Sequence, residues 1–262
     1  MRPTCAVIPA GGKGTRLYPL TYAVPKELLP LGPVPTIQHV VDELVTAGIE
    51  DIIVVTGAGK RAVEDHLDEL SRRGETTARF AYVSQKQQMG LGDAVNAAAG
   101  AVGERAFVVA LGDGIIAGPT QASLLLRMLA MYEREDARAV VAAQQVPQVN
   151  IPRYGIFAPG EKCRDGFRVV DLIEKPPIER APSNFAVCAR YVFQPTLFDY
   201  LGRQAPGTGG EIQLTDAIAA MARDRGGVYA CPLATDEYRL DVGNLTSYYD
   251  AVRRMLEGGA GS

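Results

Sequence analysis

Apolar and polar positions alternate on two different scales in the first 146 residues, and this pattern predicts both strands and helices. Continuous apolar runs, typical of strands buried on both faces, occupy residues 5–10, 51–57, 79–85, 106–113 and 137–146. Between them, apolar residues recur every three or four positions, which predicts helices over residues 35–48, 60–70, 91–100 and 119–136. Apolar strands separated by helices are typical of a parallel sheet covered on both faces, so we expect a Rossmann-like, doubly wound α/β fold.

The second half of the chain mixes shorter strands with helices. Strand patterns cover residues 154–157, 167–176, 185–193 and 228–233, and helical patterns lie near 195–202, 213–224 and 245–257. This mixture predicts an appended α+β lobe, and the tail EGGAGS at 257–262 is expected to fray. Because no Ser/Gly-rich linker separates the halves, we expect a single domain over residues 1–262, with halves at about 1–146 and 147–257.

Composition argues against several classes of protein. The chain is 47% hydrophobic and 22% charged, and no apolar run approaches the ~20 residues of a membrane span. Without a signal-peptide pattern either, a cytoplasmic protein with no membrane partner is expected. The net charge of -3 argues against nonspecific binding of nucleic acid. The four cysteines are scattered, and His39 and His66 lie on separate helical patterns, which argues against a zinc site or a Ser-His-Asp triad.

Three stretches begin where predicted strands end, at residues 10–16, 84–93 and 112–116. Because the carboxyl ends of parallel strands share one edge, where such sheets bind ligands, we expect these loops to meet. The first contains GGKGTR, whose lysine precedes its last glycine and so fails the Walker A pattern. The dinucleotide pattern GxGxxG fails at Leu17, so a P-loop kinase and a dehydrogenase are both disfavoured.

The first loop nevertheless carries groups suited to phosphate. Its glycines expose backbone N–H groups that can form an anion-binding nest, and Arg16 adds a bidentate guanidinium. Lys26 follows between Pro25 and Glu27, where the backbone is restricted. On these residues alone, a tight turn with a surface arginine and lysine remains the alternative.

The stretch GGKGTRLYPLTYAVPKELLP, residues 11–30, resembles the signature of the sugar-1-phosphate nucleotidylyltransferases, and most closely that of their bacterial uridylyl-transferring branch. Further stretches occur in the family's order over almost the whole chain, namely GLGDAV, LGDGII, RYGIF, IEKP, APSNFAVCARYVF, GGEIQLTDAI and DVGN. The resemblance implies the same α/β fold, with the nucleotide bound by the first half and the sugar phosphate by the second.

The resemblance also implies an activity: transfer of a uridylyl group from UTP to α-D-glucose 1-phosphate with release of pyrophosphate, in a Mg²⁺-dependent homo-oligomer. The acceptor is already anionic, so the site must supply charge neutralisation and in-line positioning rather than a general base. The segment between His66 and Gln85 is shorter than in typical members of that branch, where an additional helix contributes to subunit packing. Thymidylyl or cytidylyl transfer is therefore an alternative, as is, from another class, a catalytically silent nucleotide or sugar-phosphate sensor.

For the nucleotide, the resemblance implies contacts from the loop residues Ala10, Gly11, Gly12, Gly14 and Thr15. Arg16 would hold the departing pyrophosphate, and Lys26 would neutralise oxygens at the reacting phosphorus. Gln85 would read the edge of the base, and Gly90 would let the base lie against the backbone. An ordinary polar loop is the alternative for this last segment.

Two aspartates are candidate ligands for Mg²⁺. Asp113 ends a strand pattern in a Gly-Asp-Gly setting, which is also a common turn sequence, so a purely structural turn is the alternative. Asp241 in DVGN matches the second metal aspartate of the family. Two carboxylates, together with water and phosphate oxygens, suit the octahedral coordination that Mg²⁺ demands.

For the sugar phosphate, the resemblance implies Lys175 as the catalytic cation and Glu174 as an acceptor for sugar hydroxyls. A Lys-Pro pair that protects the edge of a strand is the alternative for Lys175. Gly155 and Asn184 match family positions that line the hexose. Glu211 has two interpretations of equal weight, as a cap for the helix near residue 213 or as a contact to the sugar.

Overall fold

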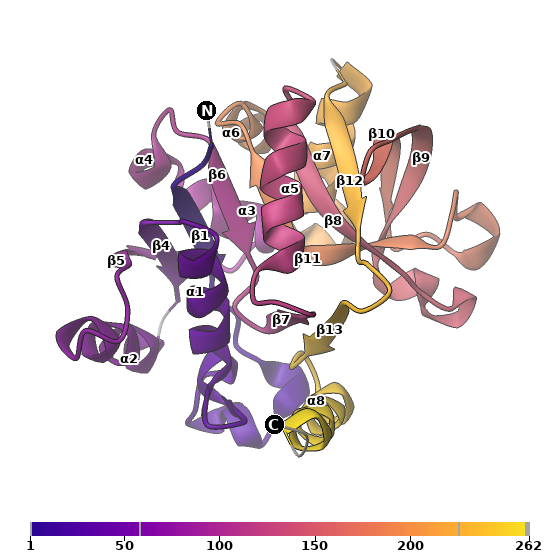
Figure 1. Ribbon diagram of the computed structural model, residues 1–262. Helices are drawn as coiled ribbons and strands as arrows, with labels where there is room; N and C mark the ends of the chain where they lie inside the picture. Colours follow the sequence, from indigo (N-terminus) through magenta and orange to yellow (C-terminus); the bar gives the residue numbers. More distant parts are fainter. Residues whose placement is uncertain (1, 58, 225, 260–262) are drawn as a thin grey trace.

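A nine-stranded mixed sheet forms the centre of this computed structural model, which describes residues 2–57, 59–224 and 226–259 (Figure 1). The strands lie in the order β5-β4-β1-β6-β11-β8-β12-β10-β9. Their bounds are β1 Cys5–Pro9, β4 Asp51–Thr56, β5 Arg79–Ser84, β6 Phe107–Ala110, β8 Ala139–Gln145, β9 Gly155–Cys163, β10 Gly166–Glu174, β11 Phe185–Phe193 and β12 Val228–Pro232. All of these strands except β10 and β11 point the same way, so the sheet is mostly parallel, as predicted.

The two halves of the chain share this sheet. In β8, from the first half, Val141 is the register partner of Tyr191 in β11 and also of Ala230 in β12. β10 and β9 then extend the same sheet as an antiparallel pair. The strands of the second half are therefore a continuation of the first half's sheet, which places residues from both halves along one edge.

Helices cover both faces of the sheet, which confirms the doubly wound fold. Successive residues of a strand face opposite sides, so Ala6 and Ile8 of β1 pack into the core beneath α1, α2 and α5. Cys5 and Val7 pack into the core on the other face, beneath α3, α4, α6 and α7. The bounds of these helices are α1 Thr36–Thr46, α2 Arg61–Arg72, α3 Leu91–Ala97, α4 Ala99–Val102, α5 Ser123–Arg134, α6 Leu197–Arg203 and α7 Leu214–Asp224.

A third, smaller core lies beyond the edge of the sheet, where the C-terminal helix packs (Figure 1). Its elements are α8 Leu245–Gly259, the antiparallel pair β7 Gly114–Ala117 and β13 Tyr238–Asp241, and the short pair β2 Pro30–Leu31 and β3 Val34–Pro35. Leu17 and Leu240 are both buried in this cluster, and the Tyr248 hydroxyl donates to the Pro30 carbonyl at 2.9 Å. This layer brings the chain around residue 241 next to the loop that follows β1.

Most predicted elements are present with ends shifted by a few residues. The helix predicted over residues 91–100 is divided into α3 and α4, and the strands β7 and β13 were not predicted. α8 extends to Gly259, and the last three residues of the tail expected to fray lie outside the described residues. In the described part of the chain, no helix is both apolar enough and long enough to cross a bilayer.

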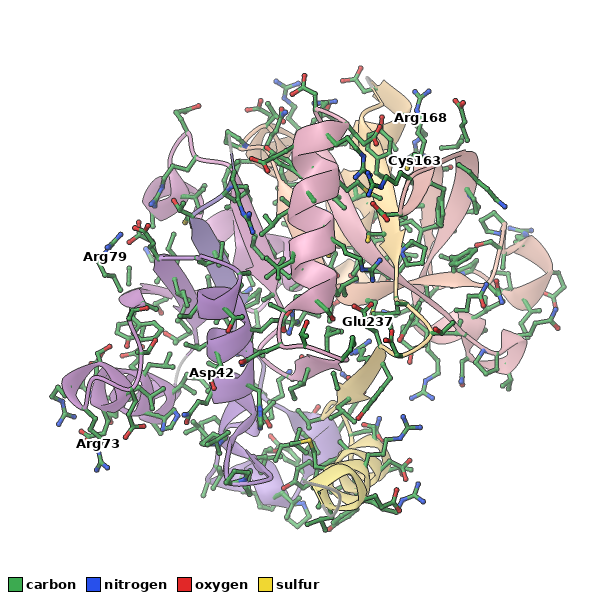
Figure 2. The ribbon with its side chains drawn as sticks, viewed as in Figure 1. Asp42, Arg73, Arg79, Cys163, Arg168 and Glu237 are labelled. Atoms are coloured by element: carbon green, nitrogen blue, oxygen red, sulfur yellow. The ribbon has the colours of Figure 1, made fainter. Side chains whose placement is uncertain are left out.

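Charged side chains divide into an outer set and a few that point inward (Figure 2). At the outer edge of the sheet, Arg79 forms an ion pair with Asp51 at 2.8 Å. Glu237, by contrast, is buried, accepts a hydrogen bond from Ser123 at 2.6 Å and forms an ion pair with Arg127 of α5. A buried carboxylate of this kind requires such partners, because an uncompensated charge in the interior is costly.

Candidate active site

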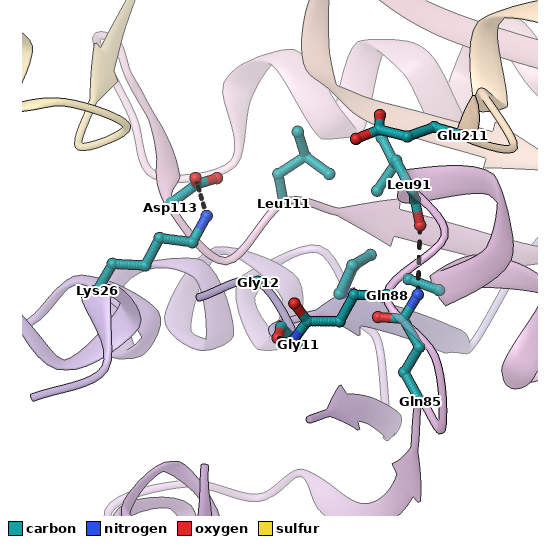
Figure 3. A pocket seen from close by; sticks show the side chains of 12 residues that line it. Gly11, Gly12, Lys26, Gln85, Gln88, Leu91, Leu111, Asp113 and Glu211 are labelled. Atoms are coloured by element: carbon teal, nitrogen blue, oxygen red, sulfur yellow. Dashed lines mark hydrogen bonds and ion pairs between the residues drawn. The ribbon is translucent and has the colours of Figure 1, made fainter. Parts of the chain in front are cut away.

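Two cavities meet at the carboxyl edge of β1 and β6, where the three predicted loops converge. The first has a volume of about 310 Å³ and is lined by residues from all three loops (Figure 3). Its lining comprises Pro9, Gly11, Gly12, Lys26, Gln85, Gln88, Gly90, Leu91, Ala94, Leu111, Asp113 and Glu211. The convergence of loops distant in sequence is therefore observed, and it follows from the shared direction of the parallel strands.

The glycines of the first loop allow close packing around the floor of this cavity. A Cβ atom on Gly11 would lie 2.8 Å from the Oε1 atom of Gln85, so a side chain there would displace that amide. Gly12 faces the Lys26 side chain, whose Cε atom would be 3.7 Å from a Cβ. Three other predicted nucleotide residues, namely Ala10, Gly14 and Thr15, line neither cavity.

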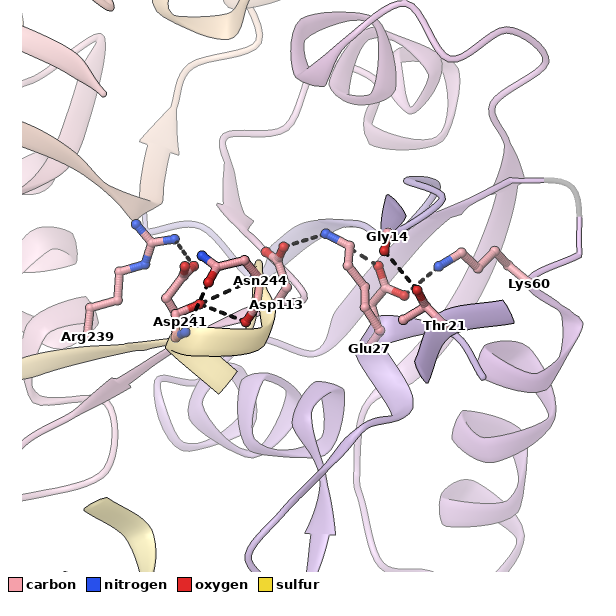
Figure 4. Close-up of polar contacts among 10 residues, drawn as sticks. Gly14, Thr21, Glu27, Lys60, Asp113, Arg239, Asp241 and Asn244 are labelled. Atoms are coloured by element: carbon pink, nitrogen blue, oxygen red, sulfur yellow. Dashed lines mark hydrogen bonds and ion pairs between the residues drawn. The ribbon is translucent and has the colours of Figure 1, made fainter. Parts of the chain in front are cut away.

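Each of those residues has an observed structural setting. The Ala10 N–H donates to the Val55 carbonyl at 2.8 Å, which ties the start of the loop to β4. Gly14 has φ of 67°, a conformation that favours glycine, and its carbonyl accepts a hydrogen bond from Thr21 at 2.8 Å (Figure 4). Thr15 begins the short turn that carries Arg16. These residues shape the loop, whereas Gly11 and Gly12 form the cavity wall.

The segment after β5 supplies amide groups to the first cavity. The Gln85 Nε2 atom donates to Asp93 at 2.6 Å, and its Oε1 atom faces Gly11. Gln88, which sequence reasoning did not assign, lines the same cavity and donates to the Gly11 carbonyl at 2.6 Å. Gly90 lines the cavity too, with φ of 105°. The candidate base-binding wall therefore contains two glutamines.

Lys26 and Asp113 form an ion pair at the centre of the site (Figures 3 and 4). Both side chains are largely buried, with 18% and 15% of their side-chain surface exposed. Burial alone would raise the pKa of Asp113, but the charge and hydrogen bond of Lys26, with a contribution from Arg239, lower it to about 2. Burial opposes the charge of Lys26, yet Asp113 and Glu27 hold its pKa above the usual value. Both groups are therefore ionised at neutral pH.

A second cavity, of about 300 Å³, adjoins the first and is lined by three of the five predicted sugar-phosphate residues, Gly155, Glu174 and Lys175. The two cavities share Leu91, Leu111 and Asp113. Five predicted site residues line only the second one, namely Arg16, Gly155, Glu174, Lys175 and Asp241. Asp113 thus stands at the boundary between a cavity of loop residues from the first half and a cavity built largely by the second half.

Lys175 is held in an unusual backbone conformation at the rim of the second cavity. Its φ is 46°, a left-handed value that costs a residue with a side chain about 1–2 kcal/mol. Its N–H donates to the Tyr154 carbonyl at 3.0 Å, and its ammonium lies 3.1 Å from Glu174. Gly155 leaves room here, because a Cβ would lie 2.8 Å from a Thr215 methyl group.

The two candidate metal ligands lie close to a pair of adjacent strands, Asp241 at the end of β13 and Asp113 directly before β7. Asp241 of β13 is the register partner of Gly114 in β7, and the Val242 N–H donates to the Asp113 carbonyl at 3.1 Å. Each carboxylate already has a cation beside it, since Arg239 donates to Asp241 at 2.5 Å while Lys26 pairs with Asp113. Among the described residues, no cluster of three or more metal-binding side chains occurs. Two carboxylates completed by phosphate and water oxygens would suit the octahedral coordination of Mg²⁺.

Two residues predicted to contact the sugar, Asn184 and Glu211, do not line the second cavity. Asn184 is exposed, its carbonyl accepts from the Val146 N–H at 3.0 Å, and it lines neither cavity. Glu211 lines the first cavity, and its carboxylate accepts a hydrogen bond from Gln213 at 2.8 Å. Glu211 therefore faces the cavity of the nucleotide loops rather than that of Glu174.

Sequence reasoning also missed two arginines of the second cavity, Arg153 and Arg239. Arg153 is the first residue of the RYGIF stretch, directly before the strand pattern over residues 154–157, and Arg239 lies two residues before Asp241. In a strand, residues two apart share a face, so Arg239 and Asp241 would have been paired had β13 been predicted. The missing signal was the strand itself.

Comparisons with known proteins identify the family of the chain. The family model described as Nucleotidyl transferase matches residues 5–258. UTP--glucose-1-phosphate uridylyltransferase 1 of Staphylococcus saprophyticus is 44% identical over 261 residues, covering 93% of this chain and 89% of that protein.

Solved structures are similar over nearly the whole chain. UDP-glucose pyrophosphorylase complexed with UDP-glucose has a TM-score of 0.90 and 32% identity, covering 98% of this chain and 100% of the other. UTP-bound UGPase from Acinetobacter baumannii has a TM-score of 0.82 and 32% identity, covering 96% of this chain and 93% of the other. Because the family model matches residues 5–258, nearly the whole chain, and the relatives are of similar size, the chain belongs to the nucleotidyl transferase family.

Proposed function

We propose that this protein transfers a uridylyl group from UTP to α-D-glucose 1-phosphate, giving UDP-glucose and pyrophosphate. The observation that carries the proposal is the pair of cavities that share Asp113, one formed by the glycine and glutamine loops and one carrying Glu174 and Lys175. A nucleotide in the first and a sugar phosphate in the second would bring their phosphates together at this boundary. The names of the relatives support the choice of UTP and glucose 1-phosphate.

In-line displacement at the α-phosphorus accounts for the kinds of residue present. The sugar phosphate attacks as an anion, so the site must bring two polyanions together and offset their repulsion. Lys26 would leave Asp113 for oxygens of the reacting phosphate. Arg16, which lines only the second cavity here, would have to turn toward the triphosphate to hold the departing pyrophosphate. Lys175, exposed at 45% of its side chain beside Glu174, would bind the phosphate of the sugar.

Asp113 and Asp241 would hold Mg²⁺ together with phosphate and water oxygens. When bound, Mg²⁺ would neutralise charge on the triphosphate and polarise the α-phosphate. Lys26 and Arg239 would move off the two carboxylates as the nucleotide enters, because phosphate oxygens offer them other anionic partners.

The glutamine wall would select the base. A uracil edge presents one N–H donor between two carbonyl acceptors, which the amides of Gln85 and Gln88 can match. Gly11 and Gly90 would let the base approach the backbone closely. A homo-oligomer is a further part of the proposal, and both cavities are lined by residues of a single chain.

Pyrophosphate release tests the proposal directly. The protein is incubated with Mg²⁺, glucose 1-phosphate and, in separate reactions, UTP, dTTP, CTP, ATP or GTP. We expect UTP to give the fastest release and Asp113→Asn to lose magnesium-dependent turnover. Faster release with dTTP would assign a thymidylyltransferase instead, and no release with any triphosphate and any hexose 1-phosphate would favour a silent sensor.

A further inference from the structure

Two buried charged residues lie directly behind the first cavity and line neither cavity. Glu27 is fully buried, and only 8% of the Lys60 side chain is exposed. They form an ion pair at 2.7 Å (Figure 4). Burying two charges is expensive, and well-packed apolar residues of similar size often stabilise a protein equally well. Such a pair therefore suggests a role other than stability.

Lys60 reaches this position from the start of α2. It immediately precedes the helix, and its N–H donates to the Gly57 carbonyl at 3.2 Å. Its ammonium is thereby directed toward Glu27, which adjoins Lys26 in the chain. The pair connects the helix after β4 with the loop after β1.

Glu27 has one oxygen engaged and one directed toward the site. Its Oε2 atom binds Lys60, whereas its Oε1 atom is buried, forms no hydrogen bond with any described residue and lies 3.9 Å from the Lys26 ammonium. The Glu27 stem passes beneath the loop after β6, since a Cβ on Gly112 would lie 3.3 Å from its Cγ atom. A small shift of Lys26 toward Oε1 would complete the missing hydrogen bond.

The four residues form a row of alternating charges, in the order Asp113, Lys26, Glu27 and Lys60. We propose that Glu27 and Lys60 are positioning residues that keep the Lys26 ammonium on the floor of the nucleotide cavity when it exchanges Asp113 for a phosphate oxygen. Glu27 supplies the second carboxylate that Lys26 retains, and Lys60 fixes Glu27. This inference rests on the proposed function, in which Lys26 binds the reacting phosphate.

Lys60 also bears on the charge of Glu27. Burial raises the pKa of Glu27, while the positive charges of Lys26 and Lys60 oppose that rise. Without Lys60, Glu27 would lose its hydrogen-bonded partner and part of this support. Asp113 would then be the only carboxylate that holds Lys26 firmly, and Asp113 competes with the substrate for the same ammonium.

A double-mutant cycle between Lys60→Met and Lys26→Met tests the inference. Single-turnover pyrophosphate release with UTP and glucose 1-phosphate is measured for the wild type, both single variants and the double variant. We expect Lys26→Met to lose roughly a thousandfold in rate. Lys60→Met should lose ten- to a hundredfold alone, but less than about threefold in the Lys26→Met background, because residues that act through one another are not additive.

The outcomes separate the two proposals. A wild-type rate for Lys26→Met would contradict the proposed role of Lys26 and the inference with it. A large loss for Lys26→Met, with the loss from Lys60→Met multiplying it in full, would overturn the inference alone. A wild-type rate for Lys60→Met would also overturn the inference alone.

Two further variants distinguish a specific loss of rate from a general loss of stability. Glu27→Gln/Lys60→Met eliminates both buried charges, and we expect it to recover thermal stability relative to Lys60→Met without recovering the rate. Arg127→Met is the matched control, because it also leaves a buried glutamate, Glu237, without its cation, yet neither residue lines the two cavities. It should lower the melting temperature and keep kcat within about twofold of the wild type. Recovery of the rate in Glu27→Gln/Lys60→Met would overturn the inference.

Discussion

Gly90 packs the loop after β5 closely against the segment before α7. Replacing Gly90 by alanine tests whether this close packing shapes the first cavity. Gly90 has φ of 105° and ψ of 179°, a region that is essentially restricted to glycine. A Cβ atom there would lie 2.8 Å from the Ile212 carbonyl oxygen and 2.9 Å from the Glu211 Cβ atom. Alanine at position 90 must therefore strain its own backbone and displace the neighbouring segment.

The two costs can be estimated separately. Backbone strain of this kind contributes about 1–3 kcal/mol, and forced displacement of packed neighbours contributes about 1–3 kcal/mol more. Gly103→Ala is a matched control, because Gly103 has φ of 63° and ψ of -138° but nothing within 4 Å of a Cβ. It should lose only the strain term. The difference between the two variants measures the displacement of residues 211 and 212.

Urea unfolding and calorimetric titration with UTP and Mg²⁺ measure both consequences. Displacing Ile212 would disturb its hydrogen bonds with Met89 at 2.6 Å and with Gly92 at 2.8 Å, which position the loop that lines the cavity. We expect Gly90→Ala to bind UTP at least about tenfold more weakly, a change of 1.4 kcal/mol, and Gly103→Ala to bind it normally. Equal unfolding free energies for the two variants, with unchanged UTP affinity in Gly90→Ala, would refute the reasoning.

Three further predictions concern charge and strain. Because Lys26 and its hydrogen bond lower the pKa of Asp113 to about 2 from 3.8, against the effect of burial, this carboxylate adds about 2 kcal/mol of stability that is lost as the pH falls from about 4 to 2. The difference in unfolding free energy between the wild type and Asp113→Asn should shrink over this range, and a constant difference would contradict it. Arg190→Met leaves Glu43 buried without the guanidinium that binds it at 2.6 Å, so urea unfolding should show a loss of about 3–5 kcal/mol, most of it recovered in Arg190→Met/Glu43→Leu. Failure of the second change to recover stability would argue against the pair. Lys175→Gly relieves a left-handed backbone and should raise the unfolding free energy by up to about 1 kcal/mol while pyrophosphate release falls at least tenfold; normal turnover would remove Lys175 from the site.

The central sheet was predictable because its signals are local. A strand such as residues 51–56 is apolar on both faces and lies between two helices, so pattern and position agree. The pair of β7 and β13 lacked such signals, since each strand has four residues and its partner lies far away in the chain. Pairing between distant segments depends on tertiary packing, which here comes from α8.

The candidate site shows the same contrast between residues marked by the local sequence and contacts that form only between distant segments. The family resemblance was sufficient to select Lys26, Asp113 and Lys175, which the structure places around adjoining cavities. It could not show that Lys60, 33 positions beyond Glu27, turns inward to bind that residue, because an ordinary helix start also carries lysine. Ion pairs between such separated residues become visible only once the elements are packed.

A crystal structure of the protein with UDP-glucose and Mg²⁺ tests the central claim most directly, that two cavities sharing Asp113 hold the two substrates. We predict that the uracil lies against Gln85 and Gln88, that the glucose lies beside Glu174, and that the diphosphate passes Asp113 between them. A nucleotide bound outside the first cavity, or a sugar that leaves the Glu174 cavity empty, would contradict the account.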